Sequence, residues 1–197
     1  MFVAWTVYMS SPGAGGGAIT DLDTDAHSVE MSAETPNPVI IFMPEGSKTH
    51  LGGTMRLGLR PTVFQPGSEW SKIRQLYSEA GQILERHRHR YEVNPEYVDR
   101  LTAAGLNFVG KDDKGERMEI VELKEHPYFV GVQFHPEYMS RVLNPSKPYL
   151  GFVAAASGYV PPYFRKYKAH TDGSFNSTLQ KFLHPEGQVL ANGNVSP

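Results

Sequence analysis

The most informative absence in this 197-residue chain is cysteine, which does not occur at all. Without it the chain has no disulfide, no thiolate ligand for zinc and no cysteine nucleophile. Lys and Arg number 19 against 21 Asp and Glu, and this balance argues against a nucleic-acid-binding surface. No apolar run approaches a transmembrane length, and no positive residue precedes the short apolar stretch at residues 1–9, which argues against a membrane span and a signal peptide.

What is present is typical of a globular domain, with 40% hydrophobic and 20% charged residues. Residues 1–24 include a Gly- and Ser-rich stretch without periodicity, and we interpret them as an atypical N-terminal extension. Residues 25–168 carry the periodic segments. Residues 169–197 are polar and predict a disordered tail. Strands and helices alternate between these limits, so the fold class is α/β.

The elements are predicted from periodicity and from turn residues. Ser68 is a fitting helix N-cap with Gly81 as the end, and Asn94 followed by Pro95 begins a second helix. Pro61 confines its strand to an edge or breaks it. The expected helices cover residues 68–81, 94–105 and 149–157. The expected strands cover residues 38–43, 55–59, 62–64, 85–93, 106–109, 117–123 and 128–134, the last two forming a hairpin.

A histidine and a carboxylate follow the strand expected at residues 128–134. Pro136 stops the pairing there, so His135 lies at its end or just past it, and Glu137 returns to the same face two residues later. An imidazole oriented by a carboxylate can take a proton from a thiol or hydroxyl. The alternative is a structural histidine. A second His-Pro-Glu, at residues 184–186, lies in the polar tail, and we interpret it as chance.

An unusual run of arginines and histidines occupies residues 85–93. In a strand, Arg86, Arg88 and Arg90 share one face and His87 and His89 the other. The arginines favour either an anionic ligand, such as an amino-acid carboxylate, or a solvated, ion-paired strand. The two histidines share a face as metal ligands do, but no third ligand accompanies them in the sequence. We therefore expect no metal site.

Four motifs of the chain belong together. They are Gly52-Gly53-Thr54-Met55-Arg56-Leu57-Gly58, Glu85-Arg86-His87-Arg88-His89-Arg90-Tyr91-Glu92-Val93-Asn94, Met118-Glu119-Ile120 and Gln133-Phe134-His135-Pro136-Glu137-Tyr138. Together they resemble the glutamine amidotransferase domain of the CTP synthase family. The resemblance covers about residues 25–158, and residues 42–49 are most similar to plant members. The resemblance implies a partial class I glutamine amidotransferase domain, flavodoxin-like, with a mixed sheet and flanking helices.

The resemblance also implies the chemistry. The domain hydrolyses L-glutamine through a cysteine thioester, and the ammonia serves a separate synthase domain that makes CTP from UTP with ATP and Mg²⁺, with GTP as effector. By position, His135 matches the catalytic base, Glu137 its orienting carboxylate, and Arg90 and Glu30 residues that contact glutamine. No cofactor is implied for this chain itself. A cytoplasmic location and association with CTP synthase subunits, which form homotetramers in the family, are implied as well.

The chain departs from the family at its front. The nucleophile belongs in a Gly-x-Cys-x-Gly turn that would fall near Thr6, where no such turn occurs, and the synthase domain has no counterpart. The sequence resembles the C-terminal part of a CTP synthase, truncated or wrongly spliced at its front. Three interpretations stay open: an enzyme portion without its nucleophile, a catalytically dead remnant that binds full-length CTP synthase, and an unrelated anion-binding α/β domain.

Overall fold

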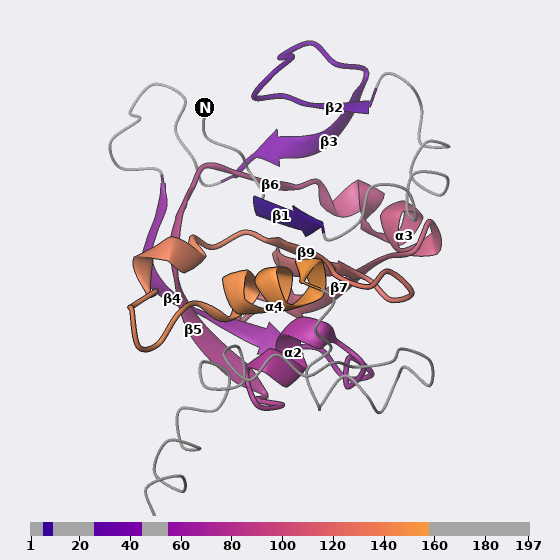
Figure 1. Ribbon diagram of the computed structural model, residues 1–197. Coiled ribbons are helices and arrows are strands. Elements are labelled where there is room, and N and C mark those ends of the chain that lie inside the picture. The colour runs from indigo at the N-terminus through magenta and orange to yellow at the C-terminus, as the bar shows by residue number, and fades with distance from the viewer. Residues whose placement is uncertain (1–5, 10–25, 45–54, 158–197) are drawn as a thin grey trace, which may run out of the picture.

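The computed structural model describes residues 6–9, 26–44 and 55–157, with only the backbone of residues 6–9 (Figure 1). Two sheets organise these residues. The six-stranded sheet has the order β1 (Thr6–Met9), β9 (Phe129–Val132), β8 (Met118–Leu123), β7 (Leu106–Lys111), β4 (Arg56–Phe64) and β5 (Gln82–His89). The three-stranded sheet has the order β2 (Ala26–Ser28), β3 (Asn37–Phe42) and β6 (Tyr91–Val93).

The two sheets differ in their pairing. Every neighbouring pair in the six-stranded sheet is antiparallel. In the three-stranded sheet, β2 and β3 are parallel and β3 and β6 are antiparallel. Within the described residues, the expected mixed pairing therefore occurs only in the smaller sheet. The hairpin expected from the last two strands is confirmed as β8 and β9.

In the part of the chain that the structure describes, three helices and one short turn of 3₁₀ helix flank the sheets. They are α2 (Lys72–Leu76), α3 (Pro95–Ala103), α4 (Lys147–Ala156) and η1 (Pro136–Tyr138). The N-cap predicted for α3 is confirmed, because the Asn94 side chain accepts a hydrogen bond from the backbone N–H of Glu96. In Figure 1, α4 lies close to α2. None of the helices within the described residues is both long and apolar enough to span a membrane.

The helix expected at residues 68–81 is wrong in length. It begins after Ser71, whose hydroxyl accepts from the Arg74 N–H, and it ends at Leu76, with Tyr77 as its C-cap. Ser78 and Glu79 both adopt a φ of 58°, a left-handed conformation that no α-helix continues. The residues expected to form one helix over 68–81 instead form a short helix and the turn after it.

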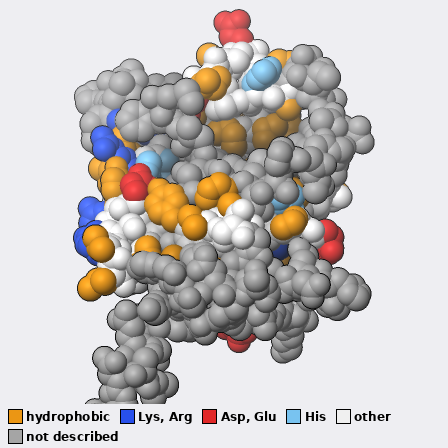
Figure 2. All heavy atoms as spheres, viewed as in Figure 1, with side chains coloured by type: hydrophobic (Ala, Val, Ile, Leu, Met, Phe, Trp, Pro, Cys, Tyr) orange, Lys and Arg blue, Asp and Glu red, His pale blue; other side chains and the backbone are white. Residues whose placement is uncertain are grey.

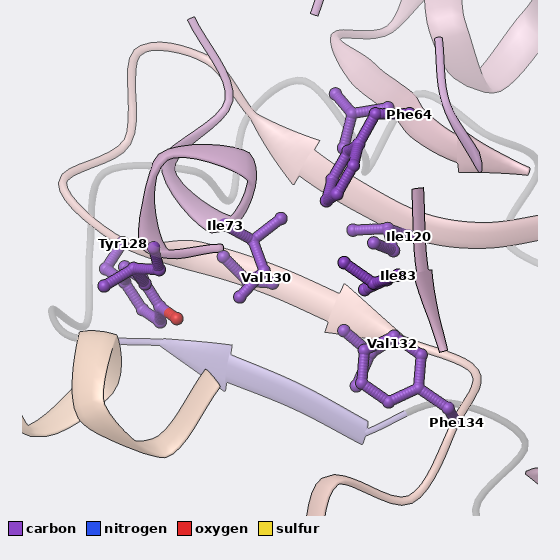
Figure 3. Close-up of a cluster of buried hydrophobic side chains, with 10 residues drawn as sticks. Phe64, Ile73, Ile83, Ile120, Tyr128, Val130, Val132 and Phe134 are labelled. Carbon is purple, nitrogen blue, oxygen red and sulfur yellow. The ribbon is translucent and has the colours of Figure 1, made fainter. Parts of the chain in front are cut away.

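Strand β8 is the centre of the fold, since all six of its residues are buried. On one side, α2 and α4 cover the main core, which Figure 3 shows as a continuous cluster. Its buried members are Phe64, Ile73, Leu76, Ile83, Val109, Ile120, Tyr128, Val130, Val132 and Phe134. A second cluster gathers Val93, Leu101 and Met118 against side chains of α3 and β3. Burial of these apolar side chains is the main source of stability.

Other strand boundaries also differ from expectation. β4 runs through Pro61 without a break, and β7 pairs with β4 only at Val63 and Phe64. At Pro61 the strand therefore pairs only with β5. On its other side a missing N–H costs no ladder bond. The single strand expected at residues 85–93 is divided at Arg90 between the two sheets. The tail at 169–197, most of the extension at 1–24 and the motif residues 52–54 lie outside the described residues, although residues 6–9 form edge strand β1.

Candidate functional site

His135 is held where the chain leaves β9. The N–H of Gln133 donates to the carbonyl of Glu119 at 2.9 Å, and the N–H of His135 donates to the carbonyl of Arg86 on β5 at 2.9 Å. Between them, Phe134 is completely buried in the main core. The backbone of His135 is therefore fixed by β5 on one side and by a core aromatic residue before it. This confirms the predicted position just past the paired strand.

The predicted contact between His135 and Glu137 is present. Nδ1 of His135 lies 2.8 Å from Oε1 of Glu137, and the one-turn helix η1 that follows His135 carries Glu137. The carboxylate only accepts, so Nδ1–H donates, and in the neutral imidazole Nε2 then carries the lone pair. The side chains are 24% and 47% exposed, so the pair is open to a small molecule. This arrangement can act as a general base.

Arg90 lies at the junction of the two sheets. Its carbonyl accepts from the N–H of Met43, and the next carbonyl, that of Tyr91, accepts from Nε2 of Gln133 at 3.3 Å. Gln133 thus connects the segment that carries His135 to the peptide beside Arg90. The side chain of Arg90 is half-buried, unlike those of Arg86 and Arg88, which are exposed. The shared face predicted for the three arginines is therefore correct only for Arg86 and Arg88, because the strand is interrupted at Arg90.

Glu30 lies apart from this pair, in the turn between β2 and β3. Its N–H donates to the hydroxyl of Ser28 at 3.2 Å, and partial burial raises the pKa of its carboxyl. Among the described residues no hydrogen bond or ion pair joins Glu30 to His135 or Glu137. The structure brings the base and its carboxylate together, and leaves the role of Glu30 as a prediction.

A buried polar cluster beneath the site was missed from the sequence. His87, His89 and Glu119 are almost inaccessible to solvent. His89 donates from Nδ1 to the carbonyl of Tyr91 at 3.0 Å, so its Nε2 accepts from Nδ1 of His87 at 3.1 Å. The Glu119 carboxylate lies 3.3 Å from His87 and 3.2 Å from a nitrogen of Arg56. The signal was available, because Glu119 and Glu122 interrupt an otherwise apolar strand.

Burial sets the protonation of this cluster. It lowers the pKa of His87 to about 2 and of His89 to about 3, so both imidazoles are neutral at pH 7. It raises the pKa of Glu119 to about 8, against the opposing effect of the Arg56 guanidinium. Removing each group from water disfavours its charged form, which gives opposite shifts for the bases and the acid.

The same three residues could hold a metal ion by distance alone, because their ligand atoms lie within 4.8 Å of one another. The expectation that His87 and His89 have no third possible ligand beside them is therefore wrong, because Glu119 lies within reach of both. However, the guanidinium of Arg56 places a positive charge 3.2 Å from the Glu119 carboxylate, which opposes a second cation. The expectation of no metal stays a prediction, now for this electrostatic reason.

Comparison with known families gives this geometry a context. Residues 16–155 match the family described as Glutamine amidotransferase class-I. The chain belongs to that family. The match includes both sheets except β1, and it includes all four predicted site residues. It begins after Thr6, so the position at which the nucleophile was expected lies outside it.

Relatives of this class-I amidotransferase chain are CTP synthases. It is 69% identical over 134 residues to "CTP synthase" of Neurospora crassa and 57% identical over 140 residues to "CTP synthase" of Schizosaccharomyces pombe. These matches cover 68% and 71% of the chain and 23% of each relative, so the chain spans about a quarter of their length. Both relatives are fungal, and the resemblance to plant members stays a prediction.

A solved structure shares the fold. It is the glutaminase domain of Trypanosoma brucei CTPS with bound acivicin, with a TM-score of 0.63 and 36% sequence identity. The likeness covers 70% of this chain and 52% of that chain. The class-I amidotransferase fold predicted from the sequence is thereby confirmed, and the region corresponds to the glutamine amidotransferase domain of CTP synthase.

The expected place of the nucleophile is described only by its backbone. Thr6 begins β1, and it pairs with Val132, three residues before His135. In the family, by the resemblance stated above, the nucleophile belongs in a strand-to-helix turn. Residue 6 instead opens an antiparallel edge strand, which does not supply that turn.

Proposed function

We propose that this chain supplies the base and the substrate-holding residues of a CTP synthase glutamine amidotransferase domain, and that it binds L-glutamine. His135 acts as the base, Glu137 orients it, and Arg90 and Glu30 contact the amino acid. The observation that carries the proposal is the 2.8 Å hydrogen bond between His135 and Glu137, at the end of a strand fixed by β5. It leaves Nε2 as the atom that accepts a proton.

The place of Arg90 suits a ligand with two different ends. Arg86, whose carbonyl fixes His135, precedes Arg90 by four residues, which is roughly 13 Å along an extended strand. Glutamine has its reacting amide at one end and its α-carboxylate at the other, and a guanidinium binds a carboxylate in bidentate geometry. Acivicin, bound by the trypanosomal relative, is a glutamine analogue.

The other properties of CTP synthases belong to a longer protein than this chain. They are the use of ATP and Mg²⁺, the response to GTP, assembly with other CTP synthase subunits and a cytoplasmic location. We infer that a protein containing this region has them, since relatives of the same region are CTP synthases about four times its length. Within the chain the proposal is limited to binding glutamine and orienting the base.

The binding proposal is tested by titrating isotope-labelled chain with L-glutamine and following amide signals by NMR. Saturable shifts near His135 are expected, and Arg90→Ala should weaken the apparent affinity at least tenfold because the carboxylate loses its charged partner. Arg86→Ala is the matched control, since Arg86 is an exposed arginine four residues earlier, on β5. Equal affinities for the two variants, or no saturable shift in the unaltered chain, contradict the proposal.

A second candidate function is association with a CTP synthase subunit, and one surface favours it. On the outer face of β4 and β5, Leu57 pairs with Arg88 and Leu59 with Arg86, and the leucines are 48% and 47% exposed. Leu84, further along, is 52% exposed. Figure 2 shows basic side chains gathered with hydrophobic ones at the edge where Figure 1 places β4 and β5. A face that alternates leucine and arginine fits an apolar, acidic partner surface.

Co-purification with full-length CTP synthase tests this candidate. Leu57→Asp together with Leu59→Asp should abolish co-purification, because the charges oppose desolvation of that face. Val153→Asp is the control, because it also replaces an exposed apolar side chain by aspartate, but on α4 instead of on β4. Retention of the complex by the double variant rules this face out.

A further inference from the structure

Tyr138 packs its ring against the candidate base. The ring centroids of His135 and Tyr138 lie 5.1 Å apart with an interplanar angle of 23°, which is a stacked arrangement. The contact follows from the backbone, because η1 is a single 3₁₀ turn in which the Tyr138 N–H donates to the His135 carbonyl at 3.2 Å. Side chains three residues apart in a 3₁₀ turn eclipse one another. The sequence His-Pro-Glu-Tyr therefore places an aromatic face beside the imidazole.

The ring of Tyr138 is itself held from β5. Nη1 of Arg88 donates to its hydroxyl in a long hydrogen bond of 3.4 Å. Two residues earlier on β5, the Arg86 carbonyl accepts from the His135 N–H. One strand thus contacts the turn at both ends, through the backbone of His135 and through the side chain of Tyr138.

These contacts restrain different motions of the imidazole. Glu137 contacts one edge of the ring, and because Glu137 is 47% exposed, that bond alone is weakened by water. An edge contact leaves the plane of the ring free to tilt about the bond. A stacked ring fixes that plane, because tilting the imidazole would separate the two aromatic faces.

We propose that Tyr138 is a positioning residue for His135: its ring fixes the imidazole plane so that Nδ1 stays hydrogen-bonded to Glu137 and Nε2 stays free to accept a proton. Arg88 supports this through the Tyr138 hydroxyl. The catalytic meaning rests on the proposed function of His135, whereas the orientation itself does not. The effect acts on His135 and requires no contact between Tyr138 and glutamine.

The test measures the tautomer of His135 in the full chain. Imidazole ¹⁵N shifts of the neutral ring report whether the proton is on Nδ1, and His135→Gln identifies the signal among the eight histidines. The unaltered chain should hold the proton mainly on Nδ1. Tyr138→Ala should lower that fraction at least twofold, while Tyr138→Phe, which keeps the aromatic face, should retain most of it. Arg88→Ala should match Tyr138→Phe in this fraction, because both variants lose the hydrogen bond between Arg88 and the Tyr138 hydroxyl.

Tyr138→Leu separates stacking from mere filling of space, since it keeps an apolar side chain without an aromatic face. It should behave like Tyr138→Ala. Backbone amide spectra establish that each variant keeps its fold, which is expected because Tyr138 is 37% exposed. An unchanged Nδ1–H fraction in folded Tyr138→Ala or Tyr138→Leu overturns the proposal. Failure of glutamine binding, measured separately, would contradict the proposed function and leave this result standing.

Discussion

The hydroxyl of Ser71 donates a 2.5 Å hydrogen bond to the carboxylate of Glu122, a residue of β8 with no exposure to solvent. The same carboxylate accepts from the N–H groups of Lys72 and Ile73, at 3.0 and 3.2 Å. A strand residue therefore satisfies the free N–H groups at the beginning of α2, where a negative charge is favourable. This contact fixes the start of α2 at Ser71 and packs the helix on the main core.

Replacing Glu122 should destabilise the fold strongly. Glu122→Gln replaces one of the two carboxylate oxygens, which together accept from three donors, by an NH₂ group that cannot accept. At least one buried donor then loses its acceptor, and the free energy of unfolding should fall by about 3 kcal/mol. Urea denaturation followed by circular dichroism measures the change. Glu125→Gln, three residues further along and exposed, is the control and should lie within about 0.5 kcal/mol of the unaltered chain. A similarly small change for Glu122→Gln would refute the capping role.

Glu119 should make stability depend on pH. Burial raises its pKa from 4.5 to about 8, so the folded state keeps a proton that the unfolded state releases above pH 4.5. The contribution of the protonated Glu119 side chain to folding stability is fully present below pH 4.5 and is lost as pH rises through 8. The unfolding free energy of the unaltered chain, relative to that of Glu119→Gln, should fall by up to about 1.4 kcal/mol per pH unit between these values. The exposed control Glu116→Gln should give a plot of unfolding free energy against pH that runs parallel to that of the unaltered chain. If the plot for Glu119→Gln also runs parallel to it, the pKa of Glu119 is not raised.

Gly151 should not tolerate a methyl group, although alanine normally favours a helix by about 1 kcal/mol. A Cβ built at Gly151 lies 2.6 Å from Cδ1 of Leu76 and closer still to the Tyr128 hydroxyl. Gly151→Ala should therefore lower the unfolding free energy by about 1–3 kcal/mol as α4 moves away from α2. Thermal unfolding measures this, with Val153→Ala on the exposed side of the same helix as the control. A stabilised Gly151→Ala would mean that α4 does not pack this closely.

Glutamine hydrolysis should be undetectable for this 197-residue polypeptide. The chain contains no cysteine, and a base without a nucleophile forms no thioester. Loss of the nucleophile, the base or the orienting carboxylate from a set of this kind lowers the rate by several orders of magnitude. Glutamate release should equal that of His135→Ala and of buffer, and no CTP should form. If the unaltered chain releases glutamate and His135→Ala does not, another residue is the nucleophile, and Thr6→Val tests the first suspect.

Zinc should not bind stoichiometrically to the buried cluster. The guanidinium of Arg56 lies beside Glu119, and a second positive charge there would be repelled in a site with little water. Metal analysis after dialysis against zinc should find well below one ion per chain. One ion per chain that is lost in His89→Ala and kept in His27→Ala, an exposed control, would establish a metal site and reverse this expectation.

The sequence predicted features that depend on neighbouring residues. The cap of α3 at Asn94, the β8–β9 hairpin and the contact between His135 and Glu137 all arise within a few residues of one another. Local spacing is enough to place such groups, because the backbone fixes their separation. The family motifs then extended this local information to the fold class, which the comparisons confirm.

Features that depend on distant residues were not predictable in this way. Ser68 and Ser71 are equally good caps by composition, and the choice falls on Ser71 because Glu122, 51 residues away, receives it. The division of the arginine strand at Arg90 follows from the pairing of β6 with β3. Glu119 joined His87 and His89 only once β8 and β5 were placed in one fold. In each case the deciding partner is remote in sequence.

The hydrogen bond from His135 to the Arg86 carbonyl has a consequence for solubility. β5 is the last strand of its sheet in the described residues, and its outward backbone groups are a template on which another chain could add a strand. The turn that carries the base occupies one of these groups and lies against the strand. The backbone of this turn therefore covers part of the edge on which a strand of another chain could pair, and it does so whatever the chemistry of His135.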